Sequence, residues 1–140
     1  MAEGQGRLDE AWAYASQSLE MATQTDSRKH IARPQRLQGE ILAASDRLDE
    51  AARTLEASVM LAENIQTPRE VWLGKAALGK VLARLGREKD AEMQFIQATQ
   101  TIEAIADKLQ APNLRRSFLA AEPVVDIYRI LGQRPPPAML

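Results

Sequence analysis

The feature that most constrains this chain is a segment that recurs after 40 residues. When residues 79–98 are aligned with residues 39–58, the matched pairs are Gly79 and Gly39, Leu82 and Leu42, Ala83 and Ala43, Arg87 and Arg47, Ala91 and Ala51, and Ala98 and Ser58. A further shift of 40 places Gly6, Arg7, Ala11 and Ser18 opposite Asp46, Arg47, Ala51 and Ser58. This third match covers only the second half of the unit. A fixed period of this size is typical of arrays built from stacked helical units.

The composition agrees with an all-helical array. Of 140 residues, 45% are hydrophobic but only 4% are aromatic, and the apolar residues are mainly Ala and Leu, which favour closely packed helices over strands. The formal net charge of -1 lacks the basic excess of a dedicated nucleic-acid-binding domain. The absence of cysteine excludes disulfides, thiolate zinc sites and a Cys nucleophile. The sequence has no long apolar run and no signal-peptide pattern, so we expect a cytoplasmic protein with neither a membrane nor a nucleic-acid partner.

The chain also lacks recognisable catalytic motifs. It contains no Gly-rich phosphate loop, no HExxH pair, no Ser elbow and no EF-hand loop. The acidic residues of segments 9–10, 49–50 and 90 recur with the repeat in a first helical turn, where the helix dipole favours negative charge. His30, the single histidine, lacks a second ligand or an orienting carboxylate. We therefore expect no enzymatic activity, no cofactor and no metal.

Apolar residues at helical spacing predict the order of the elements. We expect one domain over residues 1–132, in which residues 1–6 are a flexible lead-in or the end of a turn. Its parts are a lone second helix over 7–24, a hairpin over 28–65, a hairpin over 67–110 and closing helices over 112–132, formed by two helices or one broken helix. Within the hairpins the expected helices are 33–44, 48–64, 68–85 and 88–109. The Pro-rich tail, 133–140, is expected to be extended.

Local signals refine these boundaries. Pro34 is tolerated only in a first helical turn, so the regular helix is expected to begin near Arg33, with an earlier turn from Ser27 as the alternative. Residues 67–70, Thr-Pro-Arg-Glu, form a capping-box pattern with Pro at the first helical position. Gly39 and Gly79 are expected where helices cross closely, because no side chain intervenes. The arginines that recur in the turns are expected to bond the last carbonyls of the preceding helix; they are Arg7, Arg47 and Arg87.

The hairpin resembles a tetratricopeptide repeat (TPR). The residues that match the family pattern are Leu78-Gly79, Leu82, Gly86, Asp90-Ala91, Phe95 and Ala98, and less closely Gln38-Gly39, Leu42, Glu50-Ala51, Leu55 and Ser58. The period is 40 rather than about 34, and Gln35 and Lys75 stand where the family has a large aromatic residue. The longer repeat is similar to arrays in large bacterial signalling proteins, such as transcriptional activators with an ATPase core and ATPases joined to adenylate-cyclase domains. The resemblance implies an all-α fold in which antiparallel hairpins stack as a right-handed superhelix, or solenoid.

In such arrays the first helix of each hairpin lines a concave face, so the resemblance places partner-binding residues there. The main candidates are Arg33, Arg36, Glu40, Leu73, Lys80 and Arg84, with Ala76, Glu122, Asp126 and Arg129 as further positions on the same face. Glu40 and Lys80 occupy equivalent positions and are expected to form an exposed ion pair worth about 0 to 1 kcal/mol. The three arginines lack such an obvious partner, and we predict that their planar guanidinium groups hold an acidic or carboxylate-bearing peptide.

The resulting prediction is a non-enzymatic scaffold that binds a protein, forming the C-terminal part of a larger bacterial signalling or regulatory protein. One alternative is a regulatory domain that senses a small molecule in the groove, and another is a structural oligomerisation element. Because helix 7–24 lacks the first helix of its own hairpin, it is expected to leave an apolar face that favours upstream segments or a homodimer. Trp12 and Trp72 are interpreted as packing residues rather than peptide anchors.

Overall fold

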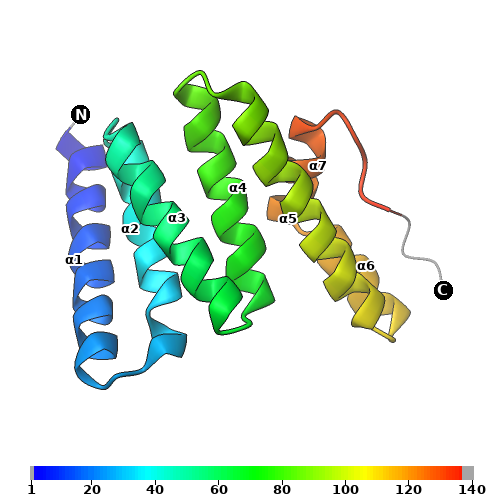
Figure 1. Ribbon diagram of the computed structural model, residues 1–140, viewed down its shortest axis with the longest axis horizontal. Coiled ribbons are helices and arrows are strands. Elements are labelled where there is room, and N and C mark those ends of the chain that lie inside the picture. The colour runs from blue at the N-terminus through cyan, green and yellow to red at the C-terminus, as the bar shows by residue number, and fades with distance from the viewer. Residues whose placement is uncertain (1, 137–140) are drawn as a thin grey trace.

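A computed structural model describes residues 2–136 of the protein. Over this range the chain forms seven α-helices and one short 3-10 helix, with no β-strand, which confirms the all-α prediction (Figure 1). The elements are α1 (Ala2–Gln24), η1 (Arg28–His30), α2 (Ala32–Ala44), α3 (Leu48–Asn64), α4 (Pro68–Arg84), α5 (Glu88–Lys108), α6 (Pro112–Leu119) and α7 (Glu122–Ile130). Met1 and the last four residues of the predicted tail, 137–140, lie outside the described residues.

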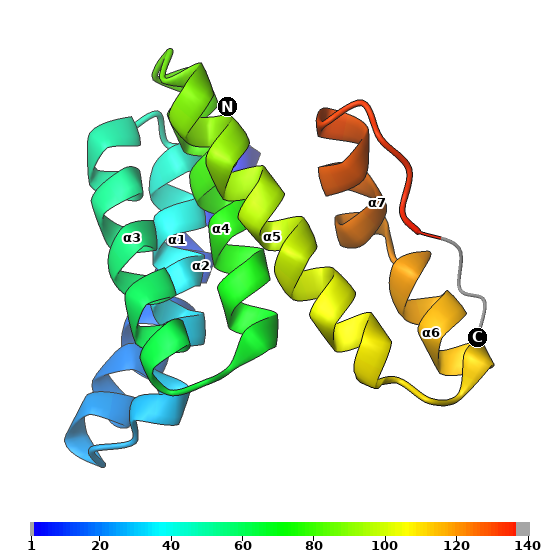
Figure 2. The same ribbon diagram turned by 45° about the vertical axis from the view of Figure 1, so that its right-hand side comes forward.

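Helices that follow one another in the chain lie side by side in an antiparallel row from α1 to α5 (Figure 1). Some helices that are not consecutive also touch: α2 contacts α4, and α5 contacts α7. After α5 the chain turns back, and the short helices α6 and α7 follow one another on one side of it (Figure 2). Helices α2 and α4, which carry Gly39 and Gly79, are therefore neighbours.

Most of the predicted helix boundaries agree with the structure to within one residue, but the N-terminal part differs. Helix α1 begins at Ala2, so the prediction of a flexible lead-in is wrong for residues 2–6, and Arg7 lies inside a helix rather than in a turn. The alternative of an earlier helical turn is correct: η1 precedes α2, and Pro34 falls in the first turn of α2, where its missing N–H costs nothing. The closing segment consists of two helices, α6 and α7.

Two glycines set how closely the helices of each hairpin approach. A Cβ placed on Gly39 would lie 2.5 Å from Cγ of Leu55, and one on Gly79 would lie 2.8 Å from Cε1 of Phe95, which confirms the predicted close crossings. Gly74, which the sequence interpretation did not single out, plays the same role between hairpins, because its Cβ would lie 2.8 Å from Cγ2 of Val59. Ala51 and Ala91, 0% and 3% exposed, complete the close packing.

Four turns of the row share one backbone conformation. The residues with positive φ are Asp26 (53°), Asp46 (61°), Gln66 (58°) and Gly86 (82°), spaced at intervals of 20 residues. In each turn the following residue caps the helix by donating its backbone N–H to a carbonyl five residues earlier, as Arg47 does to Leu42 and Arg87 to Leu82, both at 2.9 Å. This is the Schellman arrangement that closes a helix C-terminus.

The turn arginines consequently have a different role from the one predicted. Since backbone N–H groups already satisfy the last carbonyls, the guanidinium groups of Arg47 and Arg87 pair instead with Glu50 and Asp90 in the first turn of the next helix. The prediction that these side chains cap the preceding helix is wrong.

The C-terminal helices add the last part of the core. Leu119 of α6 and Val124, Ile127 and Tyr128 of α7 are buried in the same cluster as the apolar residues of α4 and α5. Trp72 packs edge-to-face on Phe118, with ring centroids 6.2 Å apart, and the hydroxyl of Tyr128 donates a hydrogen bond to Glu103 at 2.7 Å. Trp72 is buried, as predicted for a packing residue, whereas Trp12 is exposed.

Candidate partner-binding groove

A groove of about 890 Å³ lies between α2, α4 and α7. Helices α2 and α4 are the equivalent first helices of the two hairpins, and α7 lies next to α4, to which the Lys80–Asp126 pair joins it at 2.9 Å. The lining residues are Arg36, Glu40 and Ala43 from α2, Leu55 from α3, Arg69, Trp72, Leu73, Ala76, Ala77, Lys80, Val81 and Arg84 from α4, and Glu122, Pro123, Asp126 and Ile127 from α7. Residues of α2, α4 and α7 therefore share one concave surface.

The floor of the groove is apolar. Buried surfaces of Trp72, Val81 and Ile127 form part of it, and Ala76 and Ala77 leave the space that larger side chains would fill. The indole Nε1 of Trp72 is buried and has no hydrogen-bond partner among the described residues, so the ring contributes only packing here. A floor of this kind binds apolar side chains through burial, at about 0.8 kcal/mol for each CH₂ group.

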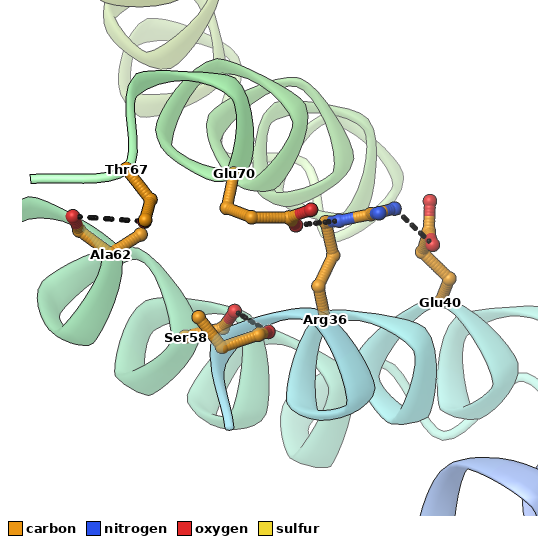
Figure 3. A network of polar contacts seen from close by, with 7 residues as sticks. Arg36, Glu40, Ser58, Ala62, Thr67 and Glu70 are labelled. Carbon is orange, nitrogen blue, oxygen red and sulfur yellow. Dashed lines mark hydrogen bonds and ion pairs between the residues drawn. The ribbon is translucent and has the colours of Figure 1, made fainter. Parts of the chain in front are cut away.

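Arg36 lies at the α2–α4 contact and is held by two carboxylates (Figure 3). Its Nε donates to Glu70 at 2.8 Å and its terminal nitrogen to Glu40 at 2.9 Å. The Arg36 side chain is only 11% exposed, so its charge is neutralised inside the protein. Burial raises the pKa of the Glu40 carboxyl; Arg36 and Lys80 oppose this shift, and the neighbouring Glu70 carboxylate adds to it.

Arg84 and Lys80 also have partners within the chain. Arg84 donates to the backbone carbonyl of Ala43 at 2.8 Å and pairs with the carboxylate of Asp46, which fastens the end of α4 to the α2–α3 turn. Lys80 pairs with Asp126 of α7 instead of Glu40. The predicted Glu40–Lys80 pair is wrong because Arg36, one helical turn before Glu40, and Asp126, on the adjoining helix, hold these two charges.

Five of the six main candidates line the groove, namely Arg36, Glu40, Leu73, Lys80 and Arg84. Of the further positions, Ala76, Glu122 and Asp126 line it, and Arg129 lies outside it. Arg33 faces a different hollow, between α1 and α2, together with Tyr14 and His30. The expectation that Arg36 and Arg84 lack partners is wrong.

The sequence interpretation gave no role in the groove to Arg69, which lines it, or to Glu70, which holds Arg36 beside it. Arg69 lines the groove and is exposed, and it forms no ion pair within residues 2–136. Glu70 was interpreted as part of a capping box, but it bonds Arg36, and Thr67 makes no side-chain cap. The helix start at Pro68 is nevertheless correct. An ion pair between residues 34 positions apart produces no match at a period of 40, so the sequence contained no signal for it.

Comparisons of the chain with protein-family models, with curated proteins and with solved structures find no match. Among the residues that the structure describes, no cluster of His, Cys, Asp and Glu could hold a metal ion. No helix in the described range is long and apolar enough to cross a membrane. The groove is therefore interpreted from its own residues.

Proposed function

We propose that this chain is a non-enzymatic protein-binding module, built as a right-handed TPR-like solenoid, whose α2–α4–α7 groove holds a segment of a partner protein. The observation that carries the proposal is the groove itself, in which equivalent helices supply an apolar floor edged by charged side chains. Support for the repeat architecture comes from the buried Ala51 and Ala91 and from the contact between α2 and α4.

The side chains of the groove favour binding over catalysis. None of its lining residues is Ser, Thr, Cys, His or Tyr, so the groove contains no hydroxyl, thiol or imidazole group that could act as a nucleophile. Its charged groups mostly form ion pairs with one another, which fixes the shape of the groove. Such a surface recognises a chain by apolar side chains and a few charges.

The charges that remain for a partner differ from those expected. Arg69 and Glu122 are exposed, line the groove and form no ion pair within the described part of the chain. A ligand carboxylate would have to displace Glu40 or Asp46 to reach Arg36 or Arg84, whereas Arg69 accepts one without competition. The partner segment that fits best therefore carries aliphatic side chains and an acidic residue placed opposite Arg69.

The test is a selection of peptides from a random display library on the immobilised chain, followed by affinity measurements on two variants. Ala76→Trp fills the floor, and we expect it to weaken the selected peptides at least about tenfold, equivalent to about 1.4 kcal/mol. Ala83→Trp places the same side chain on an exposed position of α4 outside the groove and serves as the matched control. Selected peptides that bind Ala76→Trp as tightly as the unmodified chain would contradict the proposal. A thermal shift with small metabolites but no peptide binding would favour the sensing alternative.

A further inference from the structure

A second concave surface follows the line where α1 lies against α2. Two neighbouring hollows, of about 370 Å³ and about 580 Å³, both border on Tyr14 and Leu37 and are together called the α1–α2 seam here. One hollow extends towards His30 and Arg33, and the other towards Arg7 and Ile41. Tyr14, between them, is 66% exposed. Helix α1 lies at the edge of the row (Figure 1). The α1–α2 seam shares only Glu40 with the lining of the α2–α4–α7 groove.

The interior of the protein shows what fills an equivalent surface. Helix α2 rests on both α3 and α4, where Leu55 meets Gly39 and the hydroxyl of Ser58 donates to the carbonyl of Ala32 at 2.7 Å. The residues of α3 and α4 that lie around α2 include Ala51, Ser58, Ala62, Ala77 and Val81. Their counterparts 40 residues earlier are Ala11, Ser18, Ala22, Leu37 and Ile41, and every one of them lines the α1–α2 seam.

Burial differs between the two surfaces at one level. Ala51 and Ala91 are buried, whereas their counterpart Ala11 is exposed. Ala15 and Ala22 on α1 are buried, like their counterparts Leu55 and Ala62. Ser58 donates to a helix carbonyl, and Ser18 lines an open hollow. The α1–α2 seam therefore has the residues of a helix-binding surface that is open at Ala11 and half-open at Ser18, Leu37 and Ile41.

We propose that the α1–α2 seam binds one amphipathic α-helix of a partner protein, in the position that α2 takes on α3 and α4. This interaction is separate from the proposed function of the α2–α4–α7 groove and does not depend on it. The bound helix presents an apolar face to Ala11, Leu37 and Ile41.

The structure specifies one side chain of the bound helix, at the position that corresponds to Gly39 of α2. Helices α2 and α4 need glycine where Leu55 and Phe95 reach across. The counterpart on α1 is Ala15, a short and fully buried side chain, so no residue of α1 reaches across at this level and the bound helix does not need glycine there. A leucine there adds apolar contact with Tyr14 and Leu37 on the seam.

The charge of the seam specifies the residue at a second position of the bound helix. In the interior, Arg36 of α2 pairs with Glu70, and the residue 40 positions before Glu70 is His30. His30 and Arg33 line this end of the seam, with Arg28 and Lys29 adjacent in η1. A bound helix with an acidic residue in place of Arg36 is therefore complementary to the seam, whereas an arginine is not.

The probe is a synthetic, fluorescently labelled peptide with the sequence of residues 31–46, carrying Arg36→Glu and Gly39→Leu, titrated against the full chain. We expect saturable binding that is at least about tenfold tighter than that of the peptide with Arg36 and Gly39 retained. Arg33→Glu in the protein should reverse the charge preference, so that a peptide with Arg36 and Gly39→Leu binds more tightly than the Glu peptide.

The matched protein variants are Ala11→Trp and Ala13→Trp, which place the same side chain on exposed positions of α1 inside and outside the seam. Ala11→Trp should weaken the peptide at least about tenfold, and Ala13→Trp less than about twofold. No saturable binding, or equal effects of the two variants, would overturn the proposal. A dimer seen by light scattering that Ala11→Trp dissociates would also overturn it, because the occupant would then be a second copy of the chain.

Discussion

The two hairpins, α2–α3 and α4–α5, have the same geometry but different polar residues. In both, a glycine of the first helix meets a large side chain of the second, Leu55 in one case and Phe95 in the other, and the turn residue has a positive φ whether it is Asp46 or Gly86. At the groove, however, Arg36 of one hairpin corresponds to Ala76 of the other, and Glu40 to Lys80. The small-to-large contacts set the backbone, and the groove positions vary without altering it.

The largest effect should come from shortening the large partner in each hairpin. Phe95 and Leu55 are buried against the facing glycines, so we expect Phe95→Ala to lower the free energy of unfolding by about 3–5 kcal/mol and Leu55→Ala by about 2–5 kcal/mol. Urea unfolding measures both, and Met93→Ala, on the exposed face of α5, serves as a control with an expected change below about 0.5 kcal/mol. If Leu55→Ala lowered the free energy of unfolding by less than about 1 kcal/mol, the two hairpins would not be equivalent.

The glycines themselves should show a somewhat smaller effect. Gly39→Ala and Gly79→Ala place a methyl group against Leu55 and Phe95, respectively. Each change should lower the free energy of unfolding by about 1–3 kcal/mol, although Ala has the better helix propensity. Gly6→Ala meets no atom within 4 Å and should instead stabilise by up to about 1 kcal/mol.

A double variant tests the mechanism of the glycine effect. Gly39→Ala combined with Leu55→Ala should cost less than the sum of the two single changes, because the shortened side chain no longer meets the new methyl group. Additive costs would show that the contact is not the cause.

Removing a polar contact should destabilise the protein to a different extent in each of the two hairpins. Arg36→Met leaves two carboxylates at the α2–α4 contact without their cation and should cost about 1–3 kcal/mol. Lys80→Met removes an exposed pair with Asp126 and should cost about 0–1 kcal/mol. Thermal or urea unfolding of both variants checks the order, and a larger loss for Lys80→Met would contradict the account of the groove.

The smallest expected effect concerns the charge of Glu40. Its pKa is raised, first by burial, so the folded chain holds the Glu40 proton more tightly than the unfolded chain does. The Glu40 contribution to stability therefore falls as the pH rises through and above the ordinary glutamate range. Relative to the unmodified chain, Glu40→Gln should gain stability between acidic and neutral pH, measured by unfolding across that range. A relative loss over the same range would show that the pairing with Arg36 outweighs burial.

The sequence predicted the helices of the hairpins well because their signals are local or periodic. Gly39, Gly79, Ala51 and Ala91 recur at one spacing, and Pro68 marks a helix start. Turns were predicted near these positions, but the positive φ values of Asp26, Asp46 and Gln66 were not, because a non-glycine residue gives no sign that its φ is positive.

The groove was predicted less completely. Equivalent positions could be found by a shift of 40, and most candidates on α2 and α4 do line the groove. The ion pairs could not be found in this way, because Arg36–Glu70, Arg84–Asp46 and Lys80–Asp126 join positions that are not equivalent. Their formation depends on how neighbouring helices are offset, which only the packed structure determines.

The central claim is that the first helices of successive hairpins, α2 and α4, lie side by side along one groove. Because the chain contains no cysteine, Glu40→Cys and Lys80→Cys together allow two spin labels to be attached at chosen sites. Axes of packed helices lie about 8–10 Å apart, so the doubly labelled chain should show strong dipolar broadening of its electron paramagnetic resonance spectrum. A spectrum equal to the sum of the two singly labelled chains would contradict the stacked arrangement.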